Sequence, residues 1–249
     1  MTGHRVDSGF TLVEVLIASV LLMALTTGIL LALRVGINAM DHADARLMHD
    51  RRVMAVERIL EAQVSDIVPA MIPCQTQNSE DQGPPVSFFQ GDLQTLRFVS
   101  SHSLNDSSRG LPQLLEYQVI PGENGEGVRL VVNENLYSGP LSARPFCLGT
   151  RTDQATGAQV PVFPPVRIGP GSFVIADKLA ACHFEYLQPD KDQPTIKPAV
   201  WVPHWTRPLL PNAIRIVMEP LNPEASQLPL LTLTVPIAVN RDPSVAYAN

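Results

Sequence analysis

Apolar residues dominate positions 10–33 of the chain, and no charged side chain lies between Val15 and Leu33. At about 1.5 Å of rise per residue, a helix over that run would be about 28 Å long. The hydrocarbon core of a bilayer is about 30 Å thick, whereas the apolar region of an ordinary secretory signal is only about 7–15 residues long. The pattern therefore predicts a membrane-spanning helix over residues 10–33.

Beyond this run, hydrophobic positions recur at spacings of three and four residues, which draws one apolar stripe along a helix. The positions are Val53, Val56, Leu60, Val64 and Ile67. No proline interrupts the chain between Arg34 and Ile67. We therefore expect the helix to continue outside the membrane over residues 34–68 and to pack its stripe on a globular domain.

Short runs of alternating apolar and polar residues follow the helix, as is typical of half-buried strands. We expect strands at residues 87–89, 95–100, 114–120, 128–133, 182–188, 200–202, 213–219 and 230–239. Turn residues at 121–127 and 222–227 predict two hairpins. A long helix followed by antiparallel strands indicates an α+β fold, in which the helix covers the sheet of a domain over residues 69–249.

The stretch 139–172 interrupts this alternation because it is rich in proline and glycine. Its prolines are Pro140, Pro145, Pro161, Pro164, Pro165 and Pro170. We expect an elaborated loop region with little regular structure. Loops of this kind carry partner contacts more often than scaffold elements do.

One carboxylate, Glu14, lies inside the membrane-length apolar segment. A charge near the centre of such a helix costs a few kcal/mol, so a carboxylate there marks a functional position. Residues 9–22, GFTLVEVLIASVLL, closely resemble the processing and methylation signature of type IV prepilins and type II secretion pseudopilins. The resemblance implies a leader over residues 1–9, cleavage after Gly9 by a prepilin peptidase, and N-methylation of Phe10. It also implies that Glu14 guides assembly into a filament.

The same resemblance implies a pilin-like fold and a location in the bacterial inner membrane. The chain would cross that membrane once, with its carboxy-terminal domain in the periplasm as part of a pseudopilus. The alternative is a plain single-pass anchor in which Glu14 lies at the interface by chance.

The carboxy-terminal third carries a second resemblance. Residues 173–187, FVIADKLAACHFEYL, precede Trp201 and Trp205, and the run LPNAIRI then begins at Leu210. This order is similar to the J-type minor pseudopilins of type II secretion systems, although W-type minor pilins of type IV pili share the layout. The J-type resemblance implies a non-catalytic subunit that helps to prime and cap the pseudopilus tip.

The partners implied by that resemblance are the I-type and K-type minor pseudopilins, the major pseudopilin and the prepilin peptidase. The alternative function is a W-type minor pilin with a binding role in adhesion or DNA uptake.

Composition narrows the remaining function classes. The formal net charge is −6, which argues against a general nucleic-acid binder with a basic face. The sequence contains no P-loop, nucleophile elbow or HExxH motif. We therefore expect neither enzymatic activity nor a cofactor or metal, and a membrane-anchored periplasmic enzyme is the least favoured hypothesis.

Two local clusters have a functional and a structural interpretation. Asp190 and Asp192 suit a calcium loop, but they fall short of the 6–8 oxygen ligands that calcium takes. Trp201, His204 and Trp205 suit either an aromatic contact patch or core packing.

The three cysteines, Cys74, Cys147 and Cys182, match no CxxC pattern. An oxidising compartment permits one disulfide and leaves one thiol over. Their spacing selects no pairing, and three buried thiols remain an equal alternative.

Overall fold

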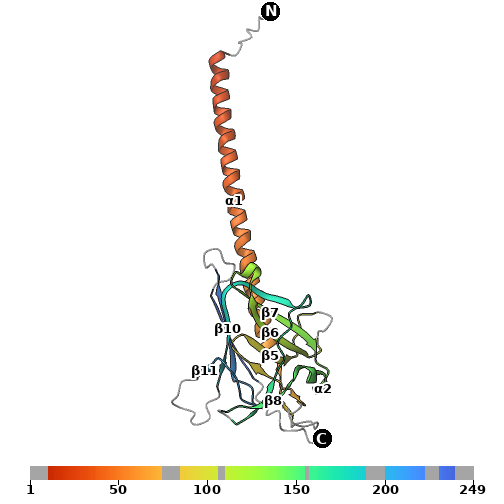
Figure 1. Cartoon of the computed structure of the whole chain (residues 1–249). Helices are drawn as coiled ribbons and strands as arrows, with labels where there is room; N and C mark the ends of the chain where they lie inside the picture. The colour runs from red at the N-terminus through yellow and green to blue at the C-terminus, as the bar shows by residue number, and fades with distance from the viewer. Residues whose placement is uncertain are drawn as a thin grey trace, which may run out of the picture. The chain divides into compact units, whose positions relative to one another are not determined.

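The computed structural model describes residues 11–74, 85–105, 110–154, 157–188, 200–221 and 230–238. The chain divides into two compact units, Met1–Arg51 and Arg52–Asn249. Its elements, many of them labelled in Figure 1, are α1 (Leu12–Ser65), β1 (Ile67–Val68), β2 (Met71–Ile72), β3 (Val86–Ser87), β4 (Gln90–Gly91), β5 (Thr95–Ser100), β6 (Gln113–Pro121), η2 (Glu123–Gly125), β7 (Val128–Leu136), α2 (Pro140–Ala143), η3 (Arg144–Phe146), β8 (Gly149–Thr152), β9 (Gln159–Val162), β10 (Phe173–Leu187), β11 (Trp201–Val202), β12 (Ala213–Pro220) and β13 (Leu231–Pro236).

The helix α1 ends at Ser65, so the predicted continuation to residue 68 is wrong by three residues. The residue before a proline is disfavoured in the α conformation, and Pro69 follows Val68 directly. Ile67 and Val68 instead form β1, which pairs antiparallel with β5 through Ile67↔Ser100 and Val68↔Val99. The chain therefore passes from helix to sheet within a few residues.

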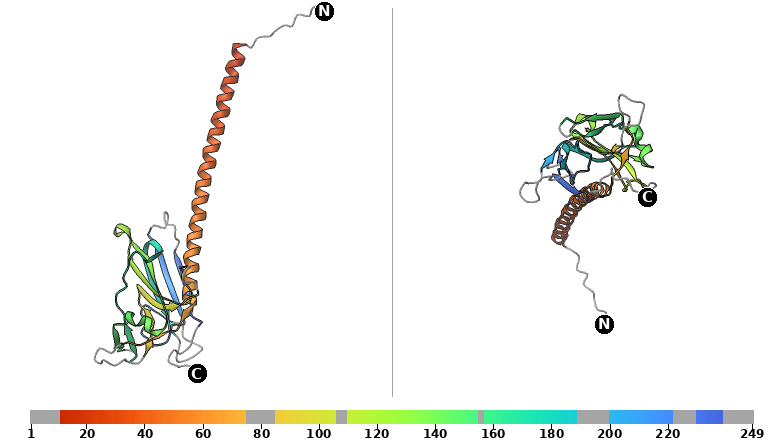
Figure 2. Two further views of the ribbon diagram at one scale, coloured as in Figure 1. Left: turned by 90° about the vertical axis from the view of Figure 1, so that its right-hand side faces the viewer. Right: turned by 90° about the horizontal axis from the view of Figure 1, so that it is seen from below.

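Among the described residues, nine strands form one antiparallel sheet in the order β1-β5-β6-β7-β10-β12-β13, with β4 paired to β5 and β11 paired to β10. The two predicted hairpins are β6–β7 and β12–β13, and both are confirmed by their registers. The carboxy-terminal turns of α1, which belong to the second unit, lie along this sheet (Figures 1 and 2). The predicted α+β fold is thus confirmed.

The main core lies between those last turns of α1 and one face of the sheet. Leu60 and Val64 are completely buried there, together with Leu115 and Tyr117 from β6. Gln63 also holds the last turns of α1 against the sheet. Its amide accepts a hydrogen bond from the Tyr117 hydroxyl and donates to Glu134 Oε1 at 2.8 Å. The predicted apolar stripe is therefore the surface through which the last turns of α1 pack on the sheet.

A Leu60→Ala variant should lose about 2–5 kcal/mol of unfolding free energy, since it leaves a cavity under a fully buried side chain. Met54 lies in the same helix but is 66% exposed, so Met54→Ala is the matched control and should change little. Urea unfolding of the purified full chain in detergent, followed by tryptophan fluorescence, measures both. Equal losses in the two variants would contradict this core assignment.

A second, smaller core covers the opposite face of the sheet. Ile72, Phe88 and Leu114 are buried in it, and a disulfide joins Cys74 to Cys147 beside them with a Cα–Cα distance of 5.7 Å. Cys182 is the buried free cysteine. The structure therefore supplies the pairing that the sequence left open, and it ties the segment after β2 to the start of the proline-rich region.

Replacing both Cys74 and Cys147 by serine should lower the unfolding free energy by about 2–5 kcal/mol, as loss of a native disulfide over a long loop does. Dithiothreitol should lower the melting temperature of the unaltered protein toward that of the variant and leave the variant unchanged. Thermal unfolding with and without the reductant tests this. A melting temperature that responds to reductant in the variant would contradict the pairing.

Two strand predictions need correction. Residues 87–89 do not form one strand, because Phe88 and Phe89 lie between β3 and β4 and are buried in opposite cores. The strand predicted at 182–188 is the second half of β10, whose first half pairs with β7 through register shifts. Lys178 adopts a positive φ of 54° between these halves, which re-aims the strand from β7 to β12.

The prediction of little regular structure over 139–172 is wrong for its first part. That part contains α2, η3 and the β8–β9 hairpin. Pro140 occupies the first turn of α2, where its fixed φ suits a helix and its missing N–H costs nothing. Residues 163–172 lack regular structure, as predicted.

Candidate functional site

The first described turn of α1 contains Glu14, whose side chain is exposed. The Glu14 backbone N–H donates to Thr11 Oγ1 at 3.3 Å and to the Thr11 carbonyl at 3.0 Å, so Thr11 caps the helix. A carboxylate in the first turn also complements the positive end of the helix dipole. Gly9 and Phe10 lie outside the described residues.

Beyond Glu14, the surface of α1 near its amino terminus is mostly apolar. Leu12–Met40 is the one helical segment within the described residues that is long and apolar enough to cross a membrane. Its few hydroxyls are satisfied within the helix. Ser19 donates to the Leu16 carbonyl at 2.8 Å, and Thr27 donates to the Met23 carbonyl at 2.7 Å. This segment therefore presents almost no unsatisfied polar group to a lipid environment.

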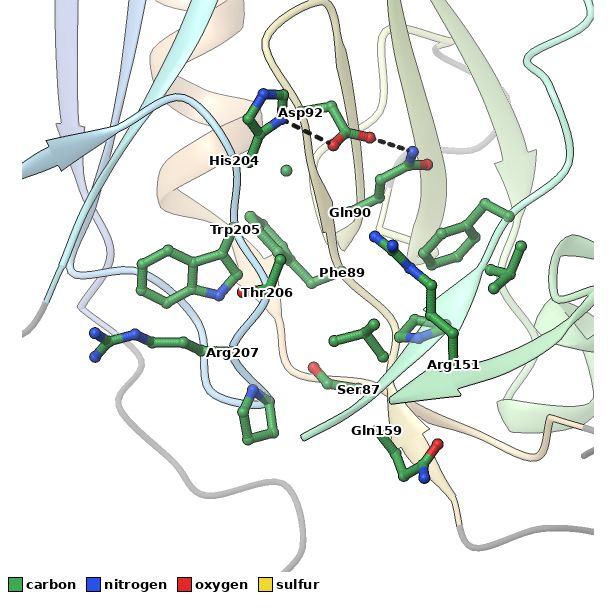
Figure 3. Close-up of a pocket in the computed structure, with 16 residues that line it drawn as sticks. Ser87, Phe89, Gln90, Asp92, Arg151, Gln159, His204, Trp205, Thr206 and Arg207 are labelled. Carbon is green, nitrogen blue, oxygen red and sulfur yellow. Dashed lines mark hydrogen bonds and ion pairs between the residues drawn. The ribbon is translucent and has the colours of Figure 1, made fainter. Parts of the chain in front are cut away.

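The second unit carries a groove of about 310 Å³ between β4 and β9, which we call the β4–β9 groove (Figure 3). One wall is β4 and the segment from His204 to Pro208, and the other wall is the β8–β9 hairpin. The Trp205 backbone N–H donates to the Gly91 carbonyl at 2.7 Å, and this bond joins the two segments of the first wall. A Cβ on Gly91 would come within 2.8 Å of the Tyr186 ring, so only glycine permits this approach.

Asp92 lies at one end of the β4–β9 groove and is well anchored. Its backbone N–H donates to the Thr95 carbonyl at 2.8 Å, and its carbonyl accepts from the Tyr186 hydroxyl at 2.9 Å. Its carboxylate accepts from Gln90 Nε2 at 2.6 Å and lies 3.3 Å from His204 Nδ1. The dashed lines in Figure 3 mark these two contacts.

The structure divides the predicted patch of Trp201, His204 and Trp205. Trp205 belongs to the main core and is 7% exposed, and its indole N–H donates to the Leu209 carbonyl at 2.7 Å. Trp201 instead stacks against Arg215, whose guanidinium carbon is 3.8 Å from the ring centroid. Of these three residues, His204 alone is exposed, and it lies at the groove. Because Trp205 is buried, its main role is core packing.

The outer face of the sheet holds a buried ion pair that no local sequence pattern signals. Arg97 Nε donates to Glu116 Oε1 at 2.8 Å, and the two side chains are only 1% and 7% exposed. Burial lowers the pKa of the Arg97 guanidinium, while the Glu116 carboxylate counteracts the shift. Arg97 Nη2 also donates to the Pro164 carbonyl at 2.5 Å, which fastens residues 163–172 over this face.

The described residues contain no group of three or more histidine, cysteine or carboxylate side chains that could hold a metal ion. Asp190 and Asp192 lie outside those residues. Burial raises the pKa of the Cys182 thiol to about 12, so this thiol is protonated and unreactive at neutral pH.

A family profile described as the prokaryotic N-terminal methylation motif matches residues 4–30 of the chain. The match includes Gly9, Phe10 and Glu14, and it covers the first part of the apolar segment of α1. No curated protein matches the chain.

Proposed function

Since its amino-terminal methylation motif places this chain in the type IV pilin and pseudopilin superfamily, we propose that it is a J-type minor pseudopilin of a type II secretion system. In this role it helps to prime and cap the tip of the pseudopilus. Its partners are the I-type and K-type minor pseudopilins and the major pseudopilin.

Membership of the superfamily implies processing by a prepilin peptidase, assembly with other pilins and a structural, non-catalytic role. The apolar segment Leu12–Met40 and the motif are consistent with an inner-membrane anchor and a periplasmic domain. We propose that residues 1–9 are the leader, that the peptidase cuts after Gly9, and that Phe10 becomes the N-methylated amino terminus.

Glu14 is the proposed assembly carboxylate, and its surroundings support this role. The part of α1 that surrounds it in the sequence is exposed and apolar, so the carboxylate has few polar neighbours on its own helix. An unpaired charge in lipid is costly and a paired charge is much less so. A free ammonium on Phe10, of the same chain or of a neighbouring subunit, therefore neutralises Glu14 best.

The observation that supports the second resemblance is the arrangement of the carboxy-terminal segments in the sheet. The run at 173–187 is a single strand, β10, which pairs with β11 at Leu187↔Trp201. It also pairs with β12, the strand that begins within the LPNAIRI run, through Phe184↔Ile216. The segments that carry the second resemblance are thus neighbours in one sheet.

Deleting the gene in its native host tests this proposal. If the chain is a J-type minor pseudopilin, the deletion strain should accumulate exported proteins in the periplasm and retain type IV pili and twitching motility. Plasmid-borne wild-type protein should restore export. Normal export together with lost piliation would instead identify a W-type minor pilin.

A further inference from the structure

We propose that a second pocket, over the outer face of β6 and β7, binds a neutral saccharide. Its volume is about 590 Å³, within the range of about 300–1,000 Å³ that is typical of small-ligand sites. We call it the β6–β7 pocket, and it lies wholly within the second unit. This inference goes beyond the proposed filament role, and it holds whichever filament the chain joins.

The β6–β7 pocket is enclosed by the sheet and by two covering segments. Strands β6 and β7 supply its floor, and residues within 145–148 and 164–172 supply its walls. Asn133 fastens the second wall, because its Nδ2 donates to the Arg167 carbonyl at 2.9 Å and its Oδ1 accepts from Ser172 Oγ at 2.5 Å. These contacts form the wall before a ligand arrives, which lowers the cost of binding.

The floor offers two side chains with unused hydrogen-bonding capacity. Glu116 is only 7% exposed, and its Oε1 accepts from Arg97 at 2.8 Å. Its Oε2 receives only two long contacts of 3.5 Å, from the amide nitrogens of Asn133 and Asn135. The amide oxygen of Asn135 has no hydrogen-bond partner within the part of the chain that the structure describes. A ligand hydroxyl that donates to Glu116 Oε2 at ordinary distance therefore makes a strong, charge-assisted bond.

The charges of the floor are balanced, which favours an uncharged ligand. The Glu116 carboxylate is paired with Arg97, and the Glu134 carboxylate accepts from Gln63 of α1 on the other side of the sheet. Arg167 also lines the pocket but is exposed, so water and salt screen its charge. A ligand carboxylate would be repelled by Glu116, and a ligand cation would compete with Arg97 for the same carboxylate.

The walls supply apolar surface that a ligand can reach. Leu148 is 61% exposed, Phe146 is half-buried, and Pro145 and Pro165 are exposed. The negative face of an aromatic ring attracts polarised C–H groups such as those of a sugar. Sugar hydroxyls both donate and accept hydrogen bonds, so they match a carboxylate beside an amide. A saccharide thus presents both kinds of surface that this pocket requires.

The backbone of the floor argues against an extended peptide as the ligand. Strand β6 is paired on both sides, with β5 through Arg97↔Glu116 and with β7 through Glu116↔Asn133. The backbone at Glu116 therefore offers no edge to which a new strand could add. A ligand that reaches this floor is held by side chains, as the hydroxyls of a sugar are.

The test uses the full chain in a polyoxyethylene detergent, whose headgroup contains no sugar. The probes are three neutral trisaccharides, namely maltotriose, cellotriose and chitotriose. Saturation-transfer NMR should detect saturable binding of at least one of them, and its titration gives a Kd. Because the probe is uncharged, 0.5 M NaCl should change this Kd less than about twofold.

Asn135→Ala should raise the Kd of the bound trisaccharide about tenfold, because it removes an amide that bonds the ligand and makes only one long contact within the described residues. Phe146→Leu probes the wall independently and should raise the Kd about threefold, since it removes the aromatic face and keeps an apolar side chain.

Asn212→Ala is the matched control. Asn212 is half-buried and lies outside the pocket lining, and its backbone N–H and carbonyl make hydrogen bonds that alanine retains. The Kd should therefore stay the same in this variant. Circular dichroism establishes that all three variants fold.

Three results would overturn the proposal: no saturable binding of any of the trisaccharides, a Kd that neither pocket variant changes more than Asn212→Ala does, or tighter and salt-sensitive binding of trigalacturonate, which would identify an anion site at Arg167. Displacement of the bound trisaccharide by an alanine hexapeptide would also overturn it, since it would identify a peptide site.

Discussion

A Glu14→Gln variant is expected to be cleaved after Gly9 and inserted in the membrane like the unaltered protein, yet to be absent from filaments. The substitution keeps the size of the side chain and removes only its charge. In the proposed role, cleavage depends on the residues around Gly9, whereas assembly depends on neutralising the Glu14 carboxylate in an apolar environment. An amide cannot neutralise the ammonium of Phe10, so the electrostatic drive to join a neighbouring subunit is lost.

The measurement is co-purification of the variant with sheared filaments, or with tagged neighbouring subunits, from native host cells. We expect the amount of variant recovered with the filaments to fall by an order of magnitude or more, since an unpaired charge inside the membrane costs a few kcal/mol. Glu61→Gln is the matched control, because Glu61 lies on the same helix and is exposed. Normal recovery of the Glu14→Gln variant would show that the carboxylate is incidental.

An Arg97→Met variant is expected to lose about 3–5 kcal/mol of unfolding free energy, because it leaves the buried Glu116 carboxylate unpaired. The loss has further contributions. Arg97 also donates to Gln90 Oε1 and to the Pro164 carbonyl, and its guanidinium lies 5.3 Å from the centre of the Phe163 ring. Each of these acceptors would lose its donor in a region from which water is largely excluded.

Replacing both partners separates the charge effect from packing. An Arg97→Met, Glu116→Leu double variant removes the unpaired charge and should recover most of the loss, since apolar replacement of a buried pair is often close to neutral. Urea unfolding of both variants in detergent provides the comparison. If the double variant were less stable than Arg97→Met alone, the buried charge would not be the cause.

The sequence predicted the main core because its signals are local. Leu115, Tyr117 and Val119 alternate along β6, and all three face α1 in the main core, as the period of two requires. The helical stripe of Leu60 and Val64 follows the same logic at a period of 3.6. These patterns depend only on neighbours in the chain.

The same alternation gave a misleading expectation for the other face of the sheet. Arg97 and Glu116 occupy positions that alternation assigns to solvent, and both are buried. They are covered by residues 163–172, whose placement depends on contacts far away in the sequence. Nothing in the local pattern around Arg97 signals that cover. The Cys74–Cys147 pairing was open for the same reason.

The candidate site divides in the same way. Gly9, Phe10 and Glu14 form a short linear motif, and a single stretch of sequence was enough to identify it. The β4–β9 groove brings together Gly91, Arg151 and Trp205 from three distant segments. Their proximity follows from the sheet register and the β8–β9 hairpin, neither of which the sequence specified at that detail.

The intact mass and amino-terminal sequence of the protein from membranes of its native host test most directly whether this chain is a processed filament subunit. We expect a mature chain that begins at N-methylated Phe10 and lacks residues 1–9. A chain that retains its leader in cells with an active prepilin peptidase would contradict it.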